Sequence, residues 1–385
     1  MVDTEDSAAT NAEVAETVEA AEAAADVVDA VPVIDGHNDT LLRCTDDERR
    51  AEKSAAVSEE VPGVDEAFLE RDGGHLDLPR ALESPLAVGI FASFVPSSAD
   101  PNTEPVDVHD GELPAAIDPE VAERVVLDQL SALNRWARAS DAFRIVEDID
   151  DLDDCLDGES LGAIAHVEGA AAIAPDLSNL DLLYAAGLRS VGITWSRPNQ
   201  FGNGVPFVHD ASPDTGDGLT DAGHDLVRAC DERGILVDCA HLNEAGFWDV
   251  VEASANPPVV SHTGAHAVCP ATRNLTDEQL AAIGDENGLV GLTFGTGFLH
   301  PEGDSDDDMP VEIMVDHIDH FVEQAGIDCV GLGSDFDGAG IPEAIGDVRG
   351  LNVLLDALRD RGYSEEEIEA IAYRNWRRVF ANVWS

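Results

Sequence analysis

Residues 33 to 40 read VIDGHNDT and bring three ionisable side chains to the end of a short apolar run. The run leads directly into Asp35, His37 and Asp39. Burying such groups is costly unless they are paired, hydrogen-bonded or bound to a metal. Alternate side chains of an extended strand share a face, so His37 and Asp39 would present a nitrogen and a carboxylate on one side. This spacing suits a pair of metal ligands, although an H-x-D motif alone is weak.

Further apolar runs end on side chains that can bind a metal or transfer a proton. These side chains are Glu168, His241, His262 and Asp335. If the runs are strands of a parallel barrel, their C-terminal ends meet at one mouth, where barrel enzymes place the active site. Together with His37 and Asp39 they give six metal-competent or acid–base groups at one level. Random placement would scatter them, so the sequence predicts an active site there.

Five of these six groups exceed the ligand set of one catalytic zinc ion, which has three protein ligands and an open position. Two metal ions that share a bridging ligand fit the set better. We therefore predict two ligands on each ion and a carboxylate between them: His37 and Asp39, His241 and His262, and Glu168. A carbamylated lysine is an unsuitable bridge here, because the single lysine, Lys53, lies in a charged insertion away from every predicted strand end.

Other histidines have more ordinary interpretations. His75 and Asp77 repeat the H-x-D pattern but follow two glycines, which favours a hydrogen-bonded turn. His317 and His320 lie at i,i+3 beside an apolar stripe, so we expect a solvated helix edge rather than a ligand pair. His166 should point the same way as the predicted bridging carboxylate and support the ligands from behind.

The elements that must position these groups are eight short runs rich in Val, Ile, Leu and Gly. They cover residues 33–39, 86–95, 161–169, 188–195, 234–242, 257–262, 288–294 and 329–338. Several are continuously apolar, as are strands covered on both faces. Helical patterns separate most of them, most clearly at 121–140, 219–234, 276–287 and 311–326. The sequence therefore predicts an α/β fold, a (β/α)8 TIM-type barrel with acidic insertions at 45–72 and 96–119.

The chain divides into two parts. Residues 1–30 form an acidic, Ala-rich tail, helical or disordered, and residues 31–385 form a single (β/α)8 metallohydrolase domain. The tail lacks the basic start and apolar core of a secretory signal, and charges interrupt every apolar run long enough to span a bilayer. Six cysteines without C-x-x-C spacing indicate neither a disulfide framework nor a thiolate zinc site. We expect a soluble, cytoplasmic protein.

The net charge of the chain excludes some classes of binding partner. The formal net charge is −58, from 79 acidic and 21 basic residues, and a single lysine is present. Such a chain repels nucleic acid and anionic membrane surfaces. Disorder could explain the charge, but 44% of residues are hydrophobic and form periodic runs. The better interpretation is a folded protein from a salt-rich cytoplasm, where counterions screen the surface carboxylates.

Six motifs occur in order along the barrel: HNDT, HVEG, DCAHLN, VVSHTGA, ATRNLTDEQL and GSDFDG. Over residues 33–380 the chain thereby resembles the membrane (renal) dipeptidases, binuclear zinc dipeptidases with a (β/α)8 fold. The resemblance implies hydrolysis of small dipeptides by a hydroxide that bridges two Zn²⁺ ions. Mn²⁺ or Co²⁺ would also suit such ligands. The implied partner is a small dipeptide, and a homodimer stays open.

The resemblance also implies roles outside the ligand set. Arg273 would take the terminal carboxylate of the substrate, and Asp335 would handle protons or the free amine. Better-known members have a histidine after the fourth strand, thought to polarise the scissile carbonyl, where this chain has Trp195. Asn199 or Asn203 could substitute for it as a substrate-binding group.

Two alternatives remain beside the dipeptidase. One is another binuclear-metal amidohydrolase, of the deacylase or lactonase type, for which a receptor for a free carboxylate such as Arg273 would be idle. The other is a non-catalytic metal-binding relative, which the loss of a ligand or of Asp335 would have indicated. Neither loss occurs in this sequence.

Overall fold

The structure is a computed structural model, and it describes residues 31–44, 68–70, 73–103, 106 and 108–385. The predicted tail 1–30 lies outside the described residues. So does most of the predicted insertion 45–72, including Lys53.

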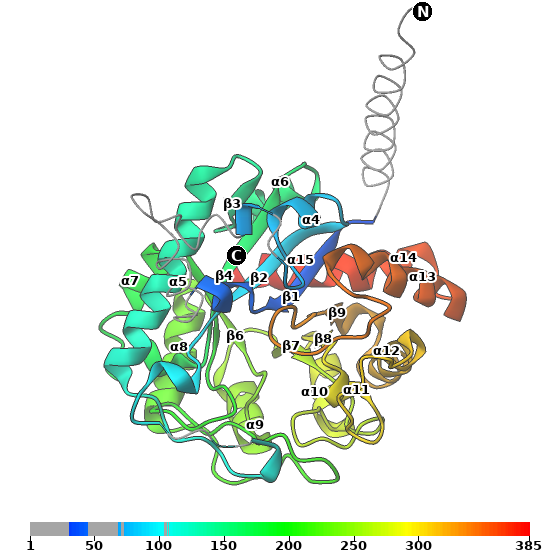
Figure 1. Cartoon of the computed structure of the whole chain (residues 1–385). Helices are drawn as coiled ribbons and strands as arrows, with labels where there is room; N and C mark the ends of the chain where they lie inside the picture. The colour runs from blue at the N-terminus through cyan, green and yellow to red at the C-terminus, as the bar shows by residue number, and fades with distance from the viewer. Residues whose placement is uncertain (1–30, 45–67, 71–72, 104–105, 107) are drawn as a thin grey trace, which may run out of the picture.

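A closed, parallel, eight-stranded barrel forms the centre of the protein (Figure 1). Its strands are β1 (Val33–Asn38), β2 (Leu86–Phe94), β4 (Leu161–Glu168), β5 (Leu188–Gly192), β6 (Leu236–Asp238), β7 (Val259–Thr263), β8 (Leu289–Leu292) and β9 (Val330–Leu332). Each pairs with its neighbours in parallel, and the ring closes because β1 pairs with β9 while β2 pairs directly with β4. The predicted (β/α)8 barrel is confirmed.

One further strand, β3 (Phe143–Ile145), was not predicted. It pairs in parallel with the first residues of β4, before β5 takes over that edge. Phe143 is its one fully buried residue, so the segment carries too few apolar residues to stand out as a strand.

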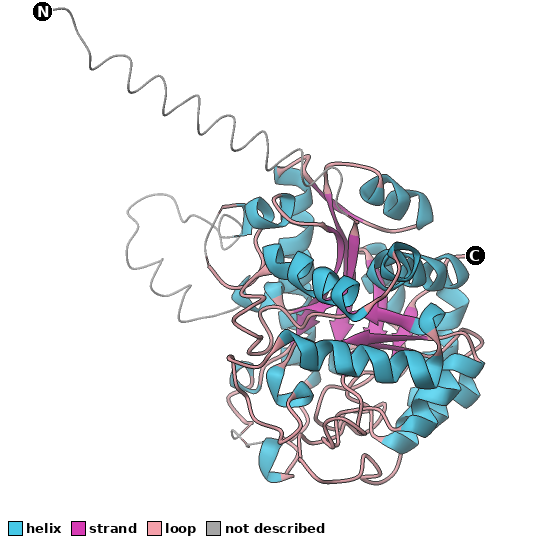
Figure 2. Cartoon of the chain, turned by 90° about the vertical axis from the view of Figure 1, so that its right-hand side faces the viewer, coloured by secondary structure: helices cyan, strands magenta, loops and turns pink. Residues whose placement is uncertain are grey.

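Helices cover the outside of the barrel (Figure 2). They are α4 (Leu78–Leu82), α5 (Pro119–Ala139), α6 (Ile149–Leu156), α7 (Leu180–Ala185), α8 (Asp221–Arg233), α9 (Glu244–Ala253), α10 (Asp277–Asp285), α11 (Thr296–Leu299), α12 (Val311–Ala325), α13 (Leu351–Arg361), α14 (Glu365–Glu369) and α15 (Asn375–Val383). The four helices predicted from their patterns correspond to α5, α8, α10 and α12. Capping explains how well their ends agree: Thr276 and Gln279 form a capping box at the start of α10, and Gly234 ends α8 in a left-handed conformation.

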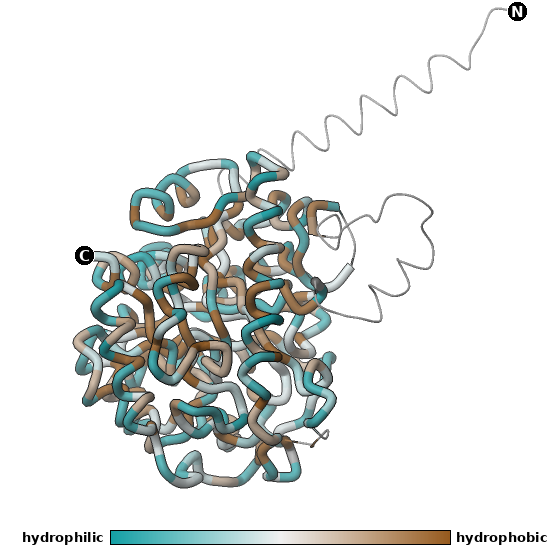
Figure 3. Tube along the Cα trace, turned by 90° about the vertical axis from the view of Figure 1, so that its left-hand side faces the viewer, coloured by the Kyte–Doolittle hydropathy of each residue, from teal (hydrophilic) through white to brown (hydrophobic). Residues whose placement is uncertain are grey.

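The core has two parts, and hydrophobic segments run through both (Figure 3). The larger lies mainly between strands and helices, and the smaller includes residues from the N-terminal halves of β1 and β2 and from α15. Trp376 of α15 reaches the strands, and its Nε1 donates to the Leu332 carbonyl at 2.9 Å. A Cβ on Gly36 would lie 2.2 Å from the Trp376 ring, so only glycine leaves room for it there. Packing by α15 therefore holds β1 and β9, which carry His37 and lead to Asp335.

Candidate metal centre and active site

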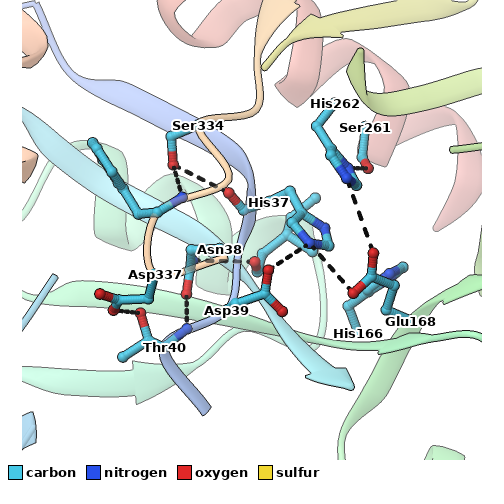
Figure 4. A network of polar contacts seen from close by, with 12 residues as sticks. His37, Asn38, Asp39, Thr40, His166, Glu168, Ser261, His262, Ser334 and Asp337 are labelled. Atoms are coloured by element: carbon cyan, nitrogen blue, oxygen red, sulfur yellow. Dashed lines mark hydrogen bonds and ion pairs between the residues drawn. The ribbon is translucent and has the colours of Figure 1, made fainter. Parts of the chain in front are cut away.

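Four of the five predicted ligands lie close together in Figure 4: His37, Asp39, Glu168 and His262. His37 lies on β1, Asp39 directly follows it, and Glu168 is the last residue of β4. His37 Nε2 lies 3.5 Å from Asp39 Oδ2 and 3.8 Å from Glu168 Oε2. All three side chains are buried. The first predicted metal position is thus assembled from β1 and β4.

The second predicted position uses the other oxygen of Glu168. Glu168 Oε1 lies 3.0 Å from His241 Nε2 and 4.0 Å from His262 Nε2, and the two Nε2 atoms are 3.2 Å apart. The His262 ring also stacks on His37, with centroids 3.8 Å apart. One carboxylate therefore faces one histidine through one oxygen and two through the other, as a bridging ligand would.

The sequence analysis placed His241 and Asp335 at the ends of strands. In the structure both residues lie beyond the strand ends. β6 ends at Asp238 and β9 at Leu332, three residues earlier in each case. Both residues instead adopt a left-handed backbone, with φ of 65° and 62°. This conformation is uncommon for residues other than glycine and often marks functional sites. Surrounding contacts must stabilise this backbone conformation. At Asp335 one such contact is the hydrogen bond that its N–H donates to the His37 carbonyl at 2.9 Å.

A hydrogen-bond chain fixes the tautomer of His262. Ser261 Oγ donates its only proton to Asp238 Oδ2 at 2.5 Å, so it can only accept from His262 Nδ1, 2.8 Å away. Nδ1 therefore carries the proton, and His262 Nε2 faces His241 and Glu168 with a bare lone pair. A second hydroxyl, Ser196 Oγ, lies 3.0 Å from His241 Nδ1. Such outer partners orient metal-binding histidines in many sites.

The donor set fits cations. Both ring nitrogens of His37 and Asp39 Oδ1 are buried without a hydrogen-bond partner among the described residues. Among the described residues, three groups of side chains bring possible ligand atoms within 4.8 Å of one another. One group is His37, Glu168 and His262, and another is His37, Asp39 and Asp335. Buried lone pairs facing one another are unfavourable unless a proton or a metal ion lies between them. The residues present thus suit metal ions.

Electrostatics agree with this interpretation. Burial lowers the pKa of His241 and of His262 well below the usual value, which keeps them in the neutral form that metals require. Burial also lowers the pKa of His37, but Glu168 and Asp39 outweigh it and raise that pKa to about 10. Burial and the charge of Asp39 raise the pKa of Asp335 to about 7. The carboxylates Glu168 and Asp39 thus favour a positive charge at His37.

Arg273 is buried in the loop after β7, with an exposed fraction of 4%. Its Nη2 donates to the His262 carbonyl at 2.7 Å, and its Nε has no partner among the described residues. Arg273 does not cap α10, because Thr276 supplies that cap. Burial lowers the pKa of Arg273 to about 10, while Asp335 counteracts this, so the guanidinium stays charged at neutral pH.

A cavity of about 270 Å³ opens beside these groups. Asp39, Glu168, His241 and Asp335 supply polar atoms, while Phe94, Trp195, Phe207 and Phe298 are among the apolar walls. A small, partly apolar cavity with a few convergent polar groups is typical of a small-molecule site.

The two predicted asparagines lie differently. The Asn199 amide donates to the Ile193 carbonyl at 2.7 Å and accepts from the Phe201 N–H at 2.8 Å. It lines a smaller cavity that adjoins the main one. The Asn203 amide donates to the Asp217 carbonyl near the surface. The structure thus brings Asn199 near the site, with its amide bonded to backbone, and does not bring Asn203 into the main cavity among the described residues.

Three other histidines can be placed. His166 is buried behind the ligands, where its Nδ1 lies 2.9 Å from Ser190 Oγ and its ring meets His37 edge-on at 5.6 Å, as expected. His75 belongs to a turn and accepts from the Asp337 N–H at 3.0 Å. The expectation of a solvated edge is wrong for His317, which is fully buried and bonds the Ala265 N–H and the Leu299 carbonyl. It holds the loops after β7 and β8 together.

Sequence reasoning missed four residues around the site. They are Ser196, Arg197, Asp238 and Ser261. Ser261 and Asp238 carried a weak signal, since one directly precedes a predicted ligand and the other ends the strand before one. Arg197 carried none, because its environment is created by loops that follow β2, β4 and β5.

Comparisons with known proteins agree on one family. The family model described as membrane dipeptidase (peptidase family M19) matches residues 21–384. A protein from the pqqA 5′ region of Klebsiella pneumoniae, whose function is uncharacterized, is 41% identical over 261 residues, 68% of this chain and 96% of its own length. No helix among the described residues is long and apolar enough to cross a membrane.

Two solved structures are also similar. One is the dipeptidase AC, a metallopeptidase of family M19, with 42% identity, a TM-score of 0.82 and coverage of 92% of this chain and 99% of its own. The other is a metallopeptidase from Rhodobacter sphaeroides, liganded with a phosphinate mimic of the dipeptide L-Ala-D-Ala. It has 41% identity and a TM-score of 0.83, and the match covers 92% of this chain and all of the other.

Proposed function

The chain belongs to the membrane dipeptidase family, peptidase family M19, and from that premise we propose a dipeptidase that works with two bound metal ions. We propose that His37 and Asp39 hold one ion, that His241 and His262 hold the other, and that Glu168 bridges them. Zinc suits this ligand set, and Mn²⁺ or Co²⁺ are alternatives.

One observation carries the proposal: the bare Nε2 lone pair of His262 faces His241 and an oxygen of Glu168. The Asp238–Ser261 pair locks this orientation, so it is a built feature rather than a chance rotamer. A metal ion bound between these three groups would satisfy all of them at once. When bound, the metal ions would supply Lewis acidity, which activates water and polarises a carbonyl.

The chain's own residues supply the other parts of the reaction. Asp335 lies in the cavity wall close to Asp39, since a Cβ on Gly338 would lie 2.3 Å from an oxygen of Asp335 and 2.0 Å from one of Asp39. From there Asp335 takes the proton of the attacking water and returns it to the leaving amine. The alternative role is to hold the free amine of the substrate.

Arg273 would receive the C-terminal carboxylate of the dipeptide. A guanidinium makes charge-assisted hydrogen bonds to a carboxylate, and Arg273 has an open Nε beside the ligand His262. Trp195 and Phe94 form part of the apolar wall of the cavity. A cavity of this size suits two residues rather than a long peptide. A salt-rich cytoplasm remains the compartment we propose, on the strength of the net charge of −58.

Hydrolysis of a small substrate panel tests the proposal. The panel holds L-Ala-L-Ala, L-Ala-D-Ala, an N-acetyl amino acid and a simple lactone, each at high KCl with added Zn²⁺. We expect cleavage of at least one dipeptide and much slower turnover of the other two classes. If the acetylated amino acid or the lactone is cleaved faster than every dipeptide, the deacylase or lactonase alternative replaces this proposal.

A further inference from the structure

Arg197, five residues beyond β5, is a second buried arginine beside the proposed metal centre. Its exposed fraction is 4%. Nη2 donates to Ser97 Oγ at 2.8 Å, and the guanidinium carbon lies 5.0 Å above the centre of the Trp195 ring. Nε and Nη1 are buried and have no hydrogen-bond partner among the described residues. Two donors on a buried cation are therefore open.

An open buried guanidinium is costly, because neither water nor a carboxylate compensates its charge. Two other buried arginines, Arg189 and Arg80, show the usual arrangement. Arg189 on β5 pairs with Glu147 at 3.0 Å and bonds several carbonyls, and Arg80 pairs with Asp77 at 2.8 Å. Arg197 makes no comparable ion pair among the described residues. Its arrangement leaves two donors for an acceptor that the described residues do not supply.

The open donors belong to a branch of the active-site cavity. The branch shares Phe94, Glu168 and Trp195 with the main cavity, and is much smaller, about 10 Å³ against about 270 Å³. The rest of its wall consists of residues from the loops after β2 and β4, which are apolar apart from Gly169, together with Arg197 and Asn199 from the loop after β5. The branch therefore admits the end of one side chain rather than a whole residue, and it offers that end a cation.

Arg273 belongs to a different side of the site. It lines a separate hollow formed by the loops after β6 and β7. Glu168, the proposed bridge, interacts electrostatically with both arginines. The main cavity shares His241 with that hollow and Glu168 with the branch. A dipeptide whose C-terminal carboxylate meets Arg273, and whose scissile bond lies over Glu168, would therefore place its N-terminal residue toward the branch.

We propose that Arg197 binds the side-chain carboxylate of an acidic N-terminal residue, so that the enzyme favours dipeptides that begin with Glu or Asp. The inference rests on the proposed dipeptidase function and specifies its substrate class. Carboxylate oxygens suit a guanidinium better than any neutral group, because the hydrogen bonds are charge-assisted. The apolar wall strengthens the attraction by excluding water.

The test compares an acid with its uncharged isostere. We would measure kcat/KM for L-Glu-Ala and L-Gln-Ala, with L- and D-Ala at the C-terminus, in the wild type and in Arg197→Met and Arg197→Lys. Because the readout is a ratio within one preparation, a partly inactive variant still gives a valid answer. Arg228→Gln is the matched control, since it removes an exposed positive charge on α8 whose ion-pair partner among the described residues is nearby Asp225.

We expect the wild type to prefer Glu over Gln by about 10- to 150-fold, the range of a charge-assisted bond. Arg197→Met should bring the ratio close to one, Arg197→Lys should give an intermediate ratio, and Arg228→Gln should keep the wild-type ratio. A wild-type ratio of one or less overturns the inference, as does a high ratio that survives in Arg197→Met. If Arg197→Met does not fold, the ratios of the wild type and Arg197→Lys decide in the same way. Failure to cleave any dipeptide would instead overturn the proposed function, and this inference with it.

Discussion

Buried arginines serve two different purposes in this protein: Arg80 is paired within the fold, whereas Arg273 and Arg197 lie near the proposed metal centre. Arg80, at the start of α4, is 6% exposed, and every direction of its guanidinium is occupied. It pairs with Asp77 at 2.8 Å and Asp347 at 3.2 Å, and it donates to the carbonyls of Gly73 and Gly74. Arg273 and Arg197, each 4% exposed, keep donors that have no hydrogen-bond partner among the described residues.

The comparison separates a group that holds the fold from groups prepared for a ligand. Around Arg80 the chain supplies two carboxylates, so the charge is compensated on folding. At the mouth of the barrel His37, Asp39 and the two arginines keep buried polar atoms open, while His241 and Asp335 adopt a strained backbone. Open donors and strain cost stability, and they persist where function requires them.

Removal of metal should have the largest effect on activity. The open lone pairs at the mouth of the barrel would bind the metal ions, and these ions would supply the Lewis acidity of the reaction. Protein purified without chelator should contain about two equivalents of zinc or a similar ion, and a chelator should abolish dipeptide hydrolysis. Glu168→Ala should lower the metal content, since it removes both oxygens between the histidines. A content near one equivalent in the wild type, unchanged in Glu168→Ala, would contradict the bridge.

Asp335→Asn should cost less than metal removal but still reduce kcat by about 10²- to 10⁴-fold, the usual contribution of a general acid–base group. The variant should keep its metal, because the proposed ligand set is complete without Asp335. Metal analysis and turnover on the same preparation check both parts. Near-normal turnover would remove Asp335 from proton transfer.

Much of this fold could be predicted because its signals are local. Continuous apolar runs marked the barrel strands, and capping residues marked the ends of α8 and α10. β3 was missed because three residues with one buried side chain resemble a loop. His317 was misjudged because its burial depends on the loops after β7 and β8, which its own helix pattern does not reveal.

The same distinction between local and non-local signals applies to the candidate site. The ligand candidates could be named because each follows an apolar run within a few residues. The left-handed backbone of His241 and Asp335 could not be predicted, because no sequence pattern marks this conformation in residues other than glycine. Arg197 was invisible for a stronger reason: its open donors are a property of three loops that meet only in the folded barrel. Sequence patterns thus predict ligands better than they predict substrate contacts.

Arg273→Ala and Arg80→Met test the comparison directly. Loss of a charge-assisted bond of roughly 1.5–3 kcal/mol corresponds to about 10- to 150-fold in kcat/KM, so Arg273→Ala should lose most of the wild-type preference for a dipeptide over its C-terminal amide. Arg80→Met should keep that preference but lose about 3 kcal/mol of unfolding free energy, because it leaves Asp77 without its ion pair. Substrate kinetics and denaturant melts on both variants separate the two roles. Equal cleavage of acid and amide by the wild type would refute the carboxylate receptor and favour the broader amidohydrolase.

The smallest effect on the folded enzyme should come from salt, which acts on exposed charges rather than on either buried site. Ion pairs such as Arg359 with Glu365 lie at the surface and contribute little each, whereas a net charge of −58 repels itself across the whole molecule. As KCl falls from 1 M to 0.1 M the Debye length grows from about 3 Å to about 10 Å, so this repulsion is less screened. We expect the melting temperature to fall along such a dilution series, while the acid-to-amide preference of the molecules that remain folded changes little. A melting temperature that stays flat or rises on dilution would contradict adaptation to a salt-rich cytoplasm, and a preference that collapses with salt would mean that the arginine sites are less buried than their 4% exposure indicates.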